Sequence, residues 1–189
     1  MNLTILDTSV IQRIDSYGNA IFDGYMEKEW VESTIRKCGI REVSDIGALS
    51  GIMMANVHES ITFAIPEYSL EETMRIKNAD KRASRVNWLL QLYECWDYFR
   101  KDIGYDKLPT KIQVDEIISQ NGLNFLKGDG DQIIVAEAIY YGCDSILHMD
   151  YKTISSRKKE LTEIGITPYT PSEYCHKFGY IQRDFLREL

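Results

Sequence analysis

Residues 131–150 read DQIIVAEAIYYGCDSILHMD. Asp131 opens this segment, an apolar run of helical character follows, and Gly142 ends the run. Ser145 to Met149 then form a short apolar run typical of a buried strand, and Asp150 comes directly after it. A helix that leads into a strand is half of an α/β unit. Such a unit places the acid after the strand at the carboxyl edge of a sheet, where open α/β folds bind ligands.

The N-terminus repeats the pattern of a strand followed by an acid. Asn2 to Leu6 is a short apolar run that predicts a strand, and Asp7 follows it directly. Ser9 lies two residues further on and is a candidate hydroxyl beside Asp7, although it also fits the start of a helix. Two strands that each end in an aspartate predict one acidic site built from both Asp7 and Asp150.

Local signals predict the other strands and the start of one helix. Ile61 to Ile65 is a strand candidate, because Pro66 follows and cannot continue a central ladder. Gly165 to Thr167 is a short last strand. Ser69 with Glu72 three residues later predicts a capping box at a helix N-terminus.

Helical spacing of apolar residues predicts the remaining elements. The expected helices cover residues 9–16, 21–38, 44–57, 79–103, 111–119, 151–161 and 171–177, with a turn at Gly18-Asn19. The predicted fold class is therefore α/β, with a short and mainly parallel sheet between helices in a three-layer α/β/α domain over residues 1–189. Residues 19–60 form a helical elaboration of this domain, and residues 178–189 a C-terminal extension.

The overall composition limits the classes of protein to which this chain can belong. A chain of 189 residues that is 44% hydrophobic is expected to be globular with a real core. It contains no run of 18 apolar residues and no charged-then-apolar leader, so we expect neither a membrane span nor a signal peptide. The four cysteines lie far apart without a C-x-x-C pair, which predicts reduced cysteines in the cytoplasm rather than a zinc site or disulfides.

The charge balance limits nucleic-acid binding without excluding a nuclease. The net charge of −7 argues against indiscriminate binding. Catalytic acids add negative charge that a bound cation neutralises. Local basic clusters near residues 77–85 and 152–159 are either solvated helix faces or surfaces that track phosphates. The nucleic-acid-binding candidates are Lys81, Arg82, Arg85 and Lys152. The aromatic stripe of residues 79–103 predicts core or a homodimer face rather than a base-stacking platform.

Several separated segments together resemble the PIN-domain family of metal-dependent nucleases, which includes VapC-like toxins. ILDTSVI at 5–11 resembles the first family motif, and AIPEYSLEET at 64–73 the second. Residues 131–150 resemble the third and fourth, because Gly142 comes 11 residues after Asp131 and Asp150 8 residues after Gly142. ITPYTPSEYC at 166–175 is similar to the family's final strand and helix.

The resemblance implies a PIN-like fold and an Mg²⁺- or Mn²⁺-dependent ribonuclease. It implies RNA as the substrate and, for a toxin of a toxin–antitoxin pair, an antitoxin protein as a partner. The residues that it marks as catalytic and metal-binding are Asp7, Glu72, Asp131 and Asp150, with Ser9 and His148 in supporting positions.

The sequence departs from the family pattern before the last acid. The family usually has Thr or Ser there, whereas this chain has His148 and Met149. His148 is either a hydrogen-bond donor to the site or a satisfied buried histidine. The second and third acids also have alternatives: Glu71 and then Glu59 for Glu72, and Asp129 for Asp131.

The chemistry of the four acids is the physical reason to expect a cation. Carboxylates in one pocket repel one another by several kcal/mol unless a cation or a basic side chain lies between them. Mg²⁺ prefers oxygen ligands, and a bound metal lowers the pKa of water for attack on a phosphodiester. Each aspartate alone is also typical of a helix N-cap. The alternatives are a non-catalytic PIN module that serves as a binding or assembly surface, and a nuclease acting on DNA or in RNA maturation.

Overall fold

A computed structural model describes residues 3–59 and 63–188, without the side chains of 56–59 and 188. Contacts divide the chain into two units. The sheet unit comprises Met1–Ile11 and Thr62–Pro168, and the helical unit comprises Gln12–Ile61 and Tyr169–Leu189. The prediction of one domain over residues 1–189 stays a prediction. Among the described residues, no helix has the length and apolar character needed to cross a membrane.

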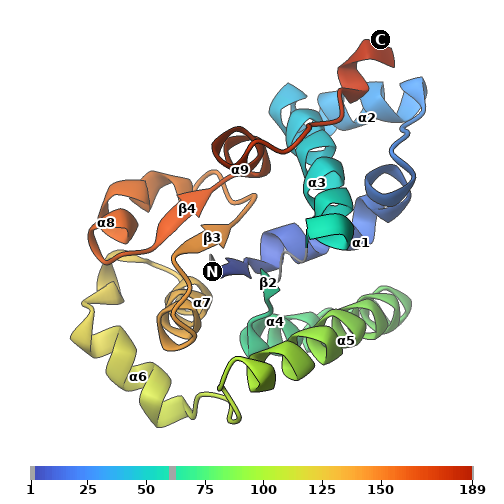
Figure 1. Cartoon of the computed structure of the whole chain (residues 1–189). Coiled ribbons are helices and arrows are strands. Elements are labelled where there is room, and N and C mark those ends of the chain that lie inside the picture. The colour runs from blue at the N-terminus through green and yellow to red at the C-terminus, as the bar shows by residue number, and fades with distance from the viewer. Residues whose placement is uncertain (1–2, 60–62, 189) are drawn as a thin grey trace. The chain divides into compact units, whose positions relative to one another are not determined.

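The sheet has four strands in the order β2-β1-β3-β4, and β1 pairs in parallel with both of its neighbours (Figure 1). Buried apolar and hydroxyl residues form β1, β2 and β3, as expected for a parallel sheet covered on its faces, whereas β4 is partly exposed. The bounds are Thr4–Leu6 for β1, Phe63–Ala64 for β2, Ser145–Leu147 for β3 and Thr167–Tyr169 for β4. The α/β class is therefore confirmed, while Asn2, Ile61 and Thr62 of the predicted strands lie outside the described residues.

The strand order places a topological switch point between β1 and β3. The chain leaves β1 for β2 on one side and later returns to the other side of β1 as β3. The Asp7 amide continues the pairing, because it donates to the Leu147 carbonyl at 2.9 Å. Ligands of open α/β sheets bind outside the carboxyl ends of strands at such a point. Asp7 and Asp150, which follow these two strands, therefore flank the position that the topology favours for a site.

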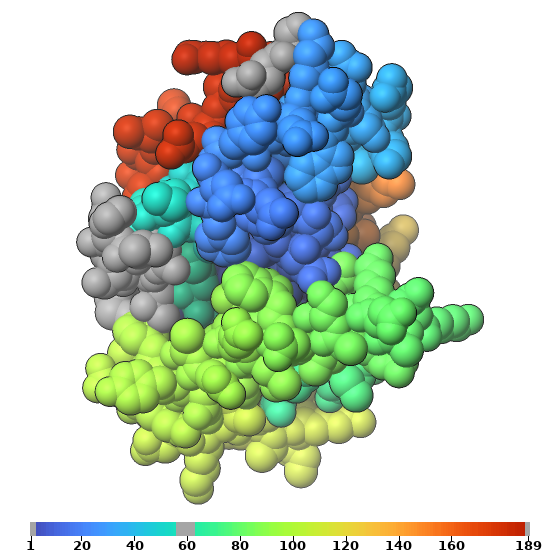
Figure 2. Space-filling view, turned by 90° about the vertical axis from the view of Figure 1, so that its right-hand side faces the viewer, coloured from blue at the N-terminus to red at the C-terminus, as the bar shows by residue number. Residues whose placement is uncertain are grey.

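Helices surround the strands of the sheet unit. Their bounds are Glu67–Met74 for α4, Ala79–Asp102 for α5, Lys111–Gln120 for α6, Asp129–Tyr140 for α7 and Lys158–Glu163 for α8, with short 3-10 turns at Leu123–Phe125 (η1) and Ser155–Arg157 (η2). From α5, Leu89 and Trp96 are buried, and Trp96 meets Tyr141 edge-on at 5.0 Å. This confirms core packing for that part of the aromatic stripe. Figure 2 shows the outer surface of α5 in green, where Leu90 and Tyr98 are exposed.

The predicted capping box at Ser69 is wrong. α4 begins at Glu67, so Ser69 lies inside its first turn, where its hydroxyl is 2.8 Å from that of Thr8. A carboxylate from another helix caps α4 instead. The amides of Glu67 and Tyr68 donate to the side chain of Glu137 in α7, at 2.8 and 3.4 Å. The cap therefore joins α4 to α7, which no local motif encodes.

The predicted helix at 151–161 begins later than expected. Residues 151–154 form turns, and the helical segments start at Ser155 and Lys158. The reason is local: Asp150 Oδ1 accepts from the amides of Lys152 and Thr153, at 2.8 and 2.9 Å. An aspartate that binds amides two and three residues ahead favours a turn over continued helix.

Most helices of the helical unit are longer than the sequence predicted, but the predicted helix at 21–38 is wrong in its first part, because residues 24–27 are not helical. The bounds are Thr8–Asp23 for α1, which begins in the sheet unit, Lys28–Cys38 for α2, Ile40–Glu59 for α3 and Pro171–Phe178 for α9, with a 3-10 turn at Phe185–Glu188 (η3). The turn at Gly18-Asn19 is wrong, since α1 continues through it with non-helical torsions at Tyr17 (φ −124°, ψ 21°). Gly39 ends α2 at φ 92°, as the sequence predicted.

The predicted start of α3 at Ser44-Asp45 is also wrong, because the helix begins at Ile40. Asp45 is fully buried, and its carboxylate accepts from the Ser172 amide at 2.9 Å. Ser172 lies in the first turn of α9. Asp45 is therefore a capping residue, but for a different helix from its own.

Gly47 of α3 allows the C-terminal segment to lie against the helix, because a Cβ atom there would come within 2.0 Å of the Arg183 carbonyl oxygen. The Arg183 amide donates to the Gly47 carbonyl at 3.0 Å. We expect Gly47→Ala to lower the free energy of unfolding by about 1–3 kcal/mol, since backbone must move. Urea unfolding measures this. Gly18→Ala is the control: no atom lies within 4 Å of its Cβ position, so its stability should be unchanged or higher, and equal losses in both variants would contradict the prediction.

Candidate functional site

Ser9 hydrogen-bonds to a residue after each of the two central strands, Asp7 after β1 and Met149 after β3. The Asp7 side chain is 4% exposed, and its Oδ2 accepts from the Ser9 amide at 2.9 Å and from the Ser9 hydroxyl. The same hydroxyl accepts from the Met149 amide at 2.9 Å. Ser9 therefore fixes Asp7 relative to the residue just before Asp150, which fits the supporting position that the sequence suggested.

The fold keeps Asp7 in an environment that disfavours its charge. Burial raises its pKa to about 6, and the two bonds from Ser9 oppose this rise. The negative charges of Asp131 and Asp150 raise the pKa further. Asp7 therefore lies within electrostatic reach of acids that follow it by more than a hundred residues.

The pKa of Asp150 shifts in the opposite direction from that of Asp7. Burial alone would raise its pKa, but the bonds from the Thr153 hydroxyl and from the amides of Thr153 and Lys152 outweigh it, and the charge of His148 acts in the same direction as those bonds. The pKa of Asp150 is therefore lowered. His148 itself is buried, at 1% exposure. Of the three aspartates, Asp150 is therefore the one that stays ionised most readily.

Asp131 and Glu72 complete the set of mutually repelling acids. Asp131 lies in the first turn of α7, half-buried. Burial raises its pKa, a hydrogen bond with Thr153 lowers it, and the charges of Asp150 and Glu72 raise it. The charges of Asp131 and Asp150 thus act on Asp7, and those of Asp150 and Glu72 act on Asp131.

The alternative acids lie elsewhere. Glu71 is exposed and pairs with Arg75 at 3.6 Å. Asp129 is exposed and lines a separate cavity. The side chain of Glu59 lies outside the described residues. The choice of Glu72 as the second acid and Asp131 as the third stays a prediction, to which the effect of the Glu72 charge on Asp131 is the link.

The contact between α4 and α7 sets the position of Glu72, and the local sequence patterns did not predict it. Glu137 of α7 is 3% exposed and caps α4, while Tyr68 of α4 lies over Gly130, where a Cβ atom would come within 2.6 Å of its ring. Gly130 is therefore required for close approach. A charged residue inside the apolar run IIVAEAIYY is the signal that could have revealed Glu137, since a buried carboxylate needs donors.

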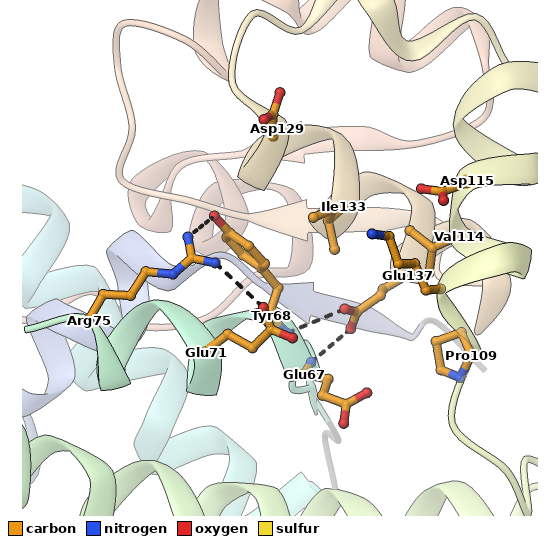
Figure 3. A pocket seen from close by; sticks show the side chains of 11 residues that line it. Glu67, Tyr68, Glu71, Arg75, Pro109, Val114, Asp115, Asp129, Ile133 and Glu137 are labelled. Atoms are coloured by element: carbon orange, nitrogen blue, oxygen red, sulfur yellow. Dashed lines mark hydrogen bonds and ion pairs between the residues drawn. The ribbon is translucent and has the colours of Figure 1, made fainter.

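A cavity of about 420 Å³ lies on the other side of this contact, between α4, α6 and α7 (Figure 3). Asp129, Ile133 and Glu137 line it from one face of α7, and Tyr68 with Arg75 from α4. Figure 3 shows the Glu137 carboxylate directed at the start of α4 and the Arg75 guanidinium directed at Tyr68. Asp7, Asp131 and Asp150 do not line this cavity.

The acids fit a hard cation by chemistry rather than by a preformed cage. Within residues 3–59 and 63–188, no group of three or more His, Cys, Asp or Glu side chains has the geometry to hold a metal ion. Oxygens of Asp7 and Asp150 are instead bonded to Ser9 and Thr153. A cation that takes several of these carboxylates would therefore require side-chain rotation, although the donor set of carboxylate oxygens suits Mg²⁺ or Mn²⁺.

The basic candidates differ in exposure. Lys81 is exposed, and Lys152 is exposed two residues after Asp150. The Arg82 guanidinium donates to the Ile76 carbonyl at 2.8 Å and is half-buried. Arg85 is only 5% exposed, so it cannot belong to an open surface that follows a phosphate backbone. The prediction for Arg85 is therefore corrected, because the amphipathic face of α5 turns that residue into the core.

Comparisons of the chain with models of protein families, with curated proteins and with solved structures find no match.

Proposed function

We propose that this protein is an Mg²⁺- or Mn²⁺-dependent endoribonuclease of PIN type, with the three-layer α/β/α arrangement of that family. Asp7, Glu72, Asp131 and Asp150 would hold the cation. One observation carries the proposal: beside the switch point of a parallel sheet, the charges of Asp131 and Asp150 raise the pKa of Asp7, and those of Asp150 and Glu72 raise the pKa of Asp131.

The energetics of these acids supports a cationic ligand. Among the described residues, the leading causes of the raised pKa of Asp7 and Asp131 include no lysine or arginine. Ionising these groups without a partner therefore costs free energy, which a divalent cation would offset. Acids whose pKa is raised without a lysine or arginine beside them are expected where charge balance comes from a ligand.

The chemistry follows from the positions of the residues. A bound cation would supply a water of lowered pKa and would stabilise charge that develops on a phosphodiester. Ser9 would keep Asp7 oriented, and the exposed Lys152 beside Asp150 would attract the phosphate backbone of the substrate. RNA as the substrate, and a role as the toxin of an antitoxin partner, come from the resemblance of the sequence motifs.

The second candidate is a non-catalytic module in which the same fold serves as a binding surface. The hydrogen bonds of Ser9 to Asp7 and of Thr153 to Asp150 favour it, since they satisfy carboxylate oxygens without a cation. The two candidates differ in one measurable property, which is the dependence of RNA cleavage on a divalent cation.

Cation dependence is the direct test. We expect the protein to cut single-stranded RNA with Mg²⁺ or Mn²⁺ and to lose this activity in EDTA. Mn²⁺ at 100 times its Kd should stabilise the fold by about 2.7 kcal/mol, which raises Tm by about 5–10 °C.

A pair of variants two residues apart controls this test. Asp131→Asn should lose both the cleavage and the Mn²⁺-dependent rise in Tm. Asp129→Asn removes an exposed acid of the same helical turn, and it should retain both. A wild-type protein that neither cuts RNA nor gains stability with Mn²⁺ would leave the non-catalytic candidate. Cleavage of DNA but not RNA would move the proposal to a different substrate.

A further inference from the structure

The cavity between α4, α6 and α7 is lined by none of the four acids proposed to hold the metal cation. Its volume of about 420 Å³ lies in the range of pockets that enclose a small organic molecule. Five carboxyl groups line it against two basic side chains, Arg75 and Lys111. Pro109, Val114 and Ile133 add apolar surface to its walls. A ligand that suits this lining carries positive charge and has an apolar part.

One edge of the cavity already holds an organic cation. The Arg75 guanidinium lies 5.5 Å from the centroid of the Tyr68 ring, donates to the Tyr68 hydroxyl at 3.3 Å and pairs with Glu71 at 3.6 Å. Figure 3 shows Arg75 directed at Tyr68 on this edge. An aromatic ring and a carboxylate are typical partners of organic cations in proteins. A side chain of the protein itself thus occupies the cavity edge as a cationic ligand would.

Two carboxylates on the other walls have no such partner. Glu67 lines the cavity from the start of α4, and Asp115 lines it from α6 (Figure 3). Neither forms an ion pair with a lysine or arginine of the described residues. Burial and the charge of Glu71 raise the pKa of Glu67, although the charge of Arg100 lowers it. A cation inside the cavity would therefore offset negative charge that the lining leaves unbalanced.

The spread of these acids favours an organic cation over a metal ion. In the part of the chain that the structure describes, no three His, Cys, Asp or Glu side chains converge with metal-binding geometry. The carboxylates of the cavity instead belong to three helices around an open volume. An alkyl diamine has two ammonium groups, each with three donors, joined by methylenes that suit apolar walls. Such a ligand can reach carboxylates on two walls at once.

We propose that this cavity binds an aliphatic diamine or polyamine, with its ammonium groups at Glu67 and Asp115 and its methylene chain against Val114 and Ile133. The walls keep their arrangement without a ligand, because the Glu137 side chain of α7 accepts from the first amides of α4 at 2.8 and 3.4 Å. A pocket that is formed in advance loses little conformational entropy on binding. The site is independent of the proposed RNA cleavage.

Calorimetric titration of the full chain tests the proposal. The probes are putrescine and spermidine, and butylamine is the control, since it has the methylene chain of putrescine but one ammonium group. NaCl at about 0.15 M screens binding that depends only on the overall negative charge of the protein. At least one of the two probes should bind about 10-fold more tightly than butylamine, because the second ammonium group adds a hydrogen bond between charged groups.

A pair of neighbouring acids on α6 supplies the matched variants. Asp115→Asn should raise the Kd of the better probe by about 3–10-fold, and Glu67→Gln combined with it should bring the Kd to about the butylamine value. Glu116→Gln removes the next acid of the same helix, which does not line the cavity, and should leave the Kd unchanged. If the double variant does not fold, as judged by circular dichroism, Asp115→Asn against Glu116→Gln carries the comparison.

Three results would overturn the proposal. In the first, neither putrescine nor spermidine binds the wild-type protein more tightly than butylamine. In the second, Glu116→Gln weakens binding as much as Asp115→Asn, which means that the amines respond only to the total charge. In the third, Asp131→Asn abolishes binding while Asp115→Asn does not, which places the amine at the acids beside the sheet.

Discussion

Asp7→Asn is expected to lower the kcat/KM of RNA cleavage by about 10²–10³-fold and to stabilise the metal-free protein at the same time. Asp7 is almost fully buried, and its pKa is raised to about 6. Because the pKa of an aspartate in the unfolded chain is about 3.9, the ionised form costs the fold about 3 kcal/mol above pH 7. Asparagine has nearly the same shape, carries no charge and can still accept from the Ser9 amide. Function and stability are thus expected to move in opposite directions.

Two measurements check this result. Cleavage of single-stranded RNA under saturating Mn²⁺ gives kcat/KM, and urea unfolding in EDTA at pH 8 gives the free energy of unfolding. Asp129→Asn, which removes an exposed acid outside the group, should change neither by much. An Asp7→Asn protein that cuts RNA as fast as the parent, or that is less stable than the parent in EDTA, would remove Asp7 from the site.

The second large effect is a loss of stability of the metal-free protein as the pH rises from 5 to 8. Burial raises the pKa of Glu137 from 4.5 to about 7, and that of Asp7 from 3.8 to about 6. A folded-state pKa above the unfolded value means that folding favours the protonated form. The stabilisation from such a group is fully present when the pH is below its pKa in the unfolded chain. It is lost as the pH rises through its pKa in the folded protein. Each group then accounts for about 3 kcal/mol.

The other carboxyl groups with shifted pKa values do not reverse this loss of stability. Burial is also the main reason that the pKa values of Glu42, Glu67 and Asp131 are raised. The contributions of these groups to stability therefore also decrease as the pH rises. The pKa of Asp150 is lowered, so its contribution is lost only in more acidic solution, below the unfolded value of 3.8. The interval from pH 5 to 8 should therefore show a steady decrease in stability.

Urea unfolding at four pH values in EDTA measures this slope. Glu137→Gln keeps an oxygen that can accept from the Glu67 amide but cannot titrate, so the slope should fall by at most about half, because Asp7 and the other raised groups still titrate. Saturating Mn²⁺ should remove the part that comes from Asp7, because a cation compensates the ionised carboxylate. A stability that is constant or increases between pH 5 and 8 would contradict the raised pKa values on which this prediction depends.

The sequence by itself determined those parts of the molecule that local patterns encode. The segment 131–150 formed a helix, a left-handed glycine at Gly142 (φ 66°) and a strand, because apolar periodicity and a residue without Cβ act over a few neighbours. The strands that end before Asp7 and Asp150 became neighbours in a parallel sheet. The position of the acidic group at its carboxyl edge followed from that order, since parallel strands end on the same side.

Only the tertiary structure decided which side chains serve elements far away in the chain. Asp45 had the appearance of a cap for its own helix but caps α9, and Glu137, which the sequence patterns did not single out, caps α4. A backbone amide accepts any carboxylate that arrives in the right geometry, so its partner is chosen by packing in three dimensions rather than by spacing along the chain.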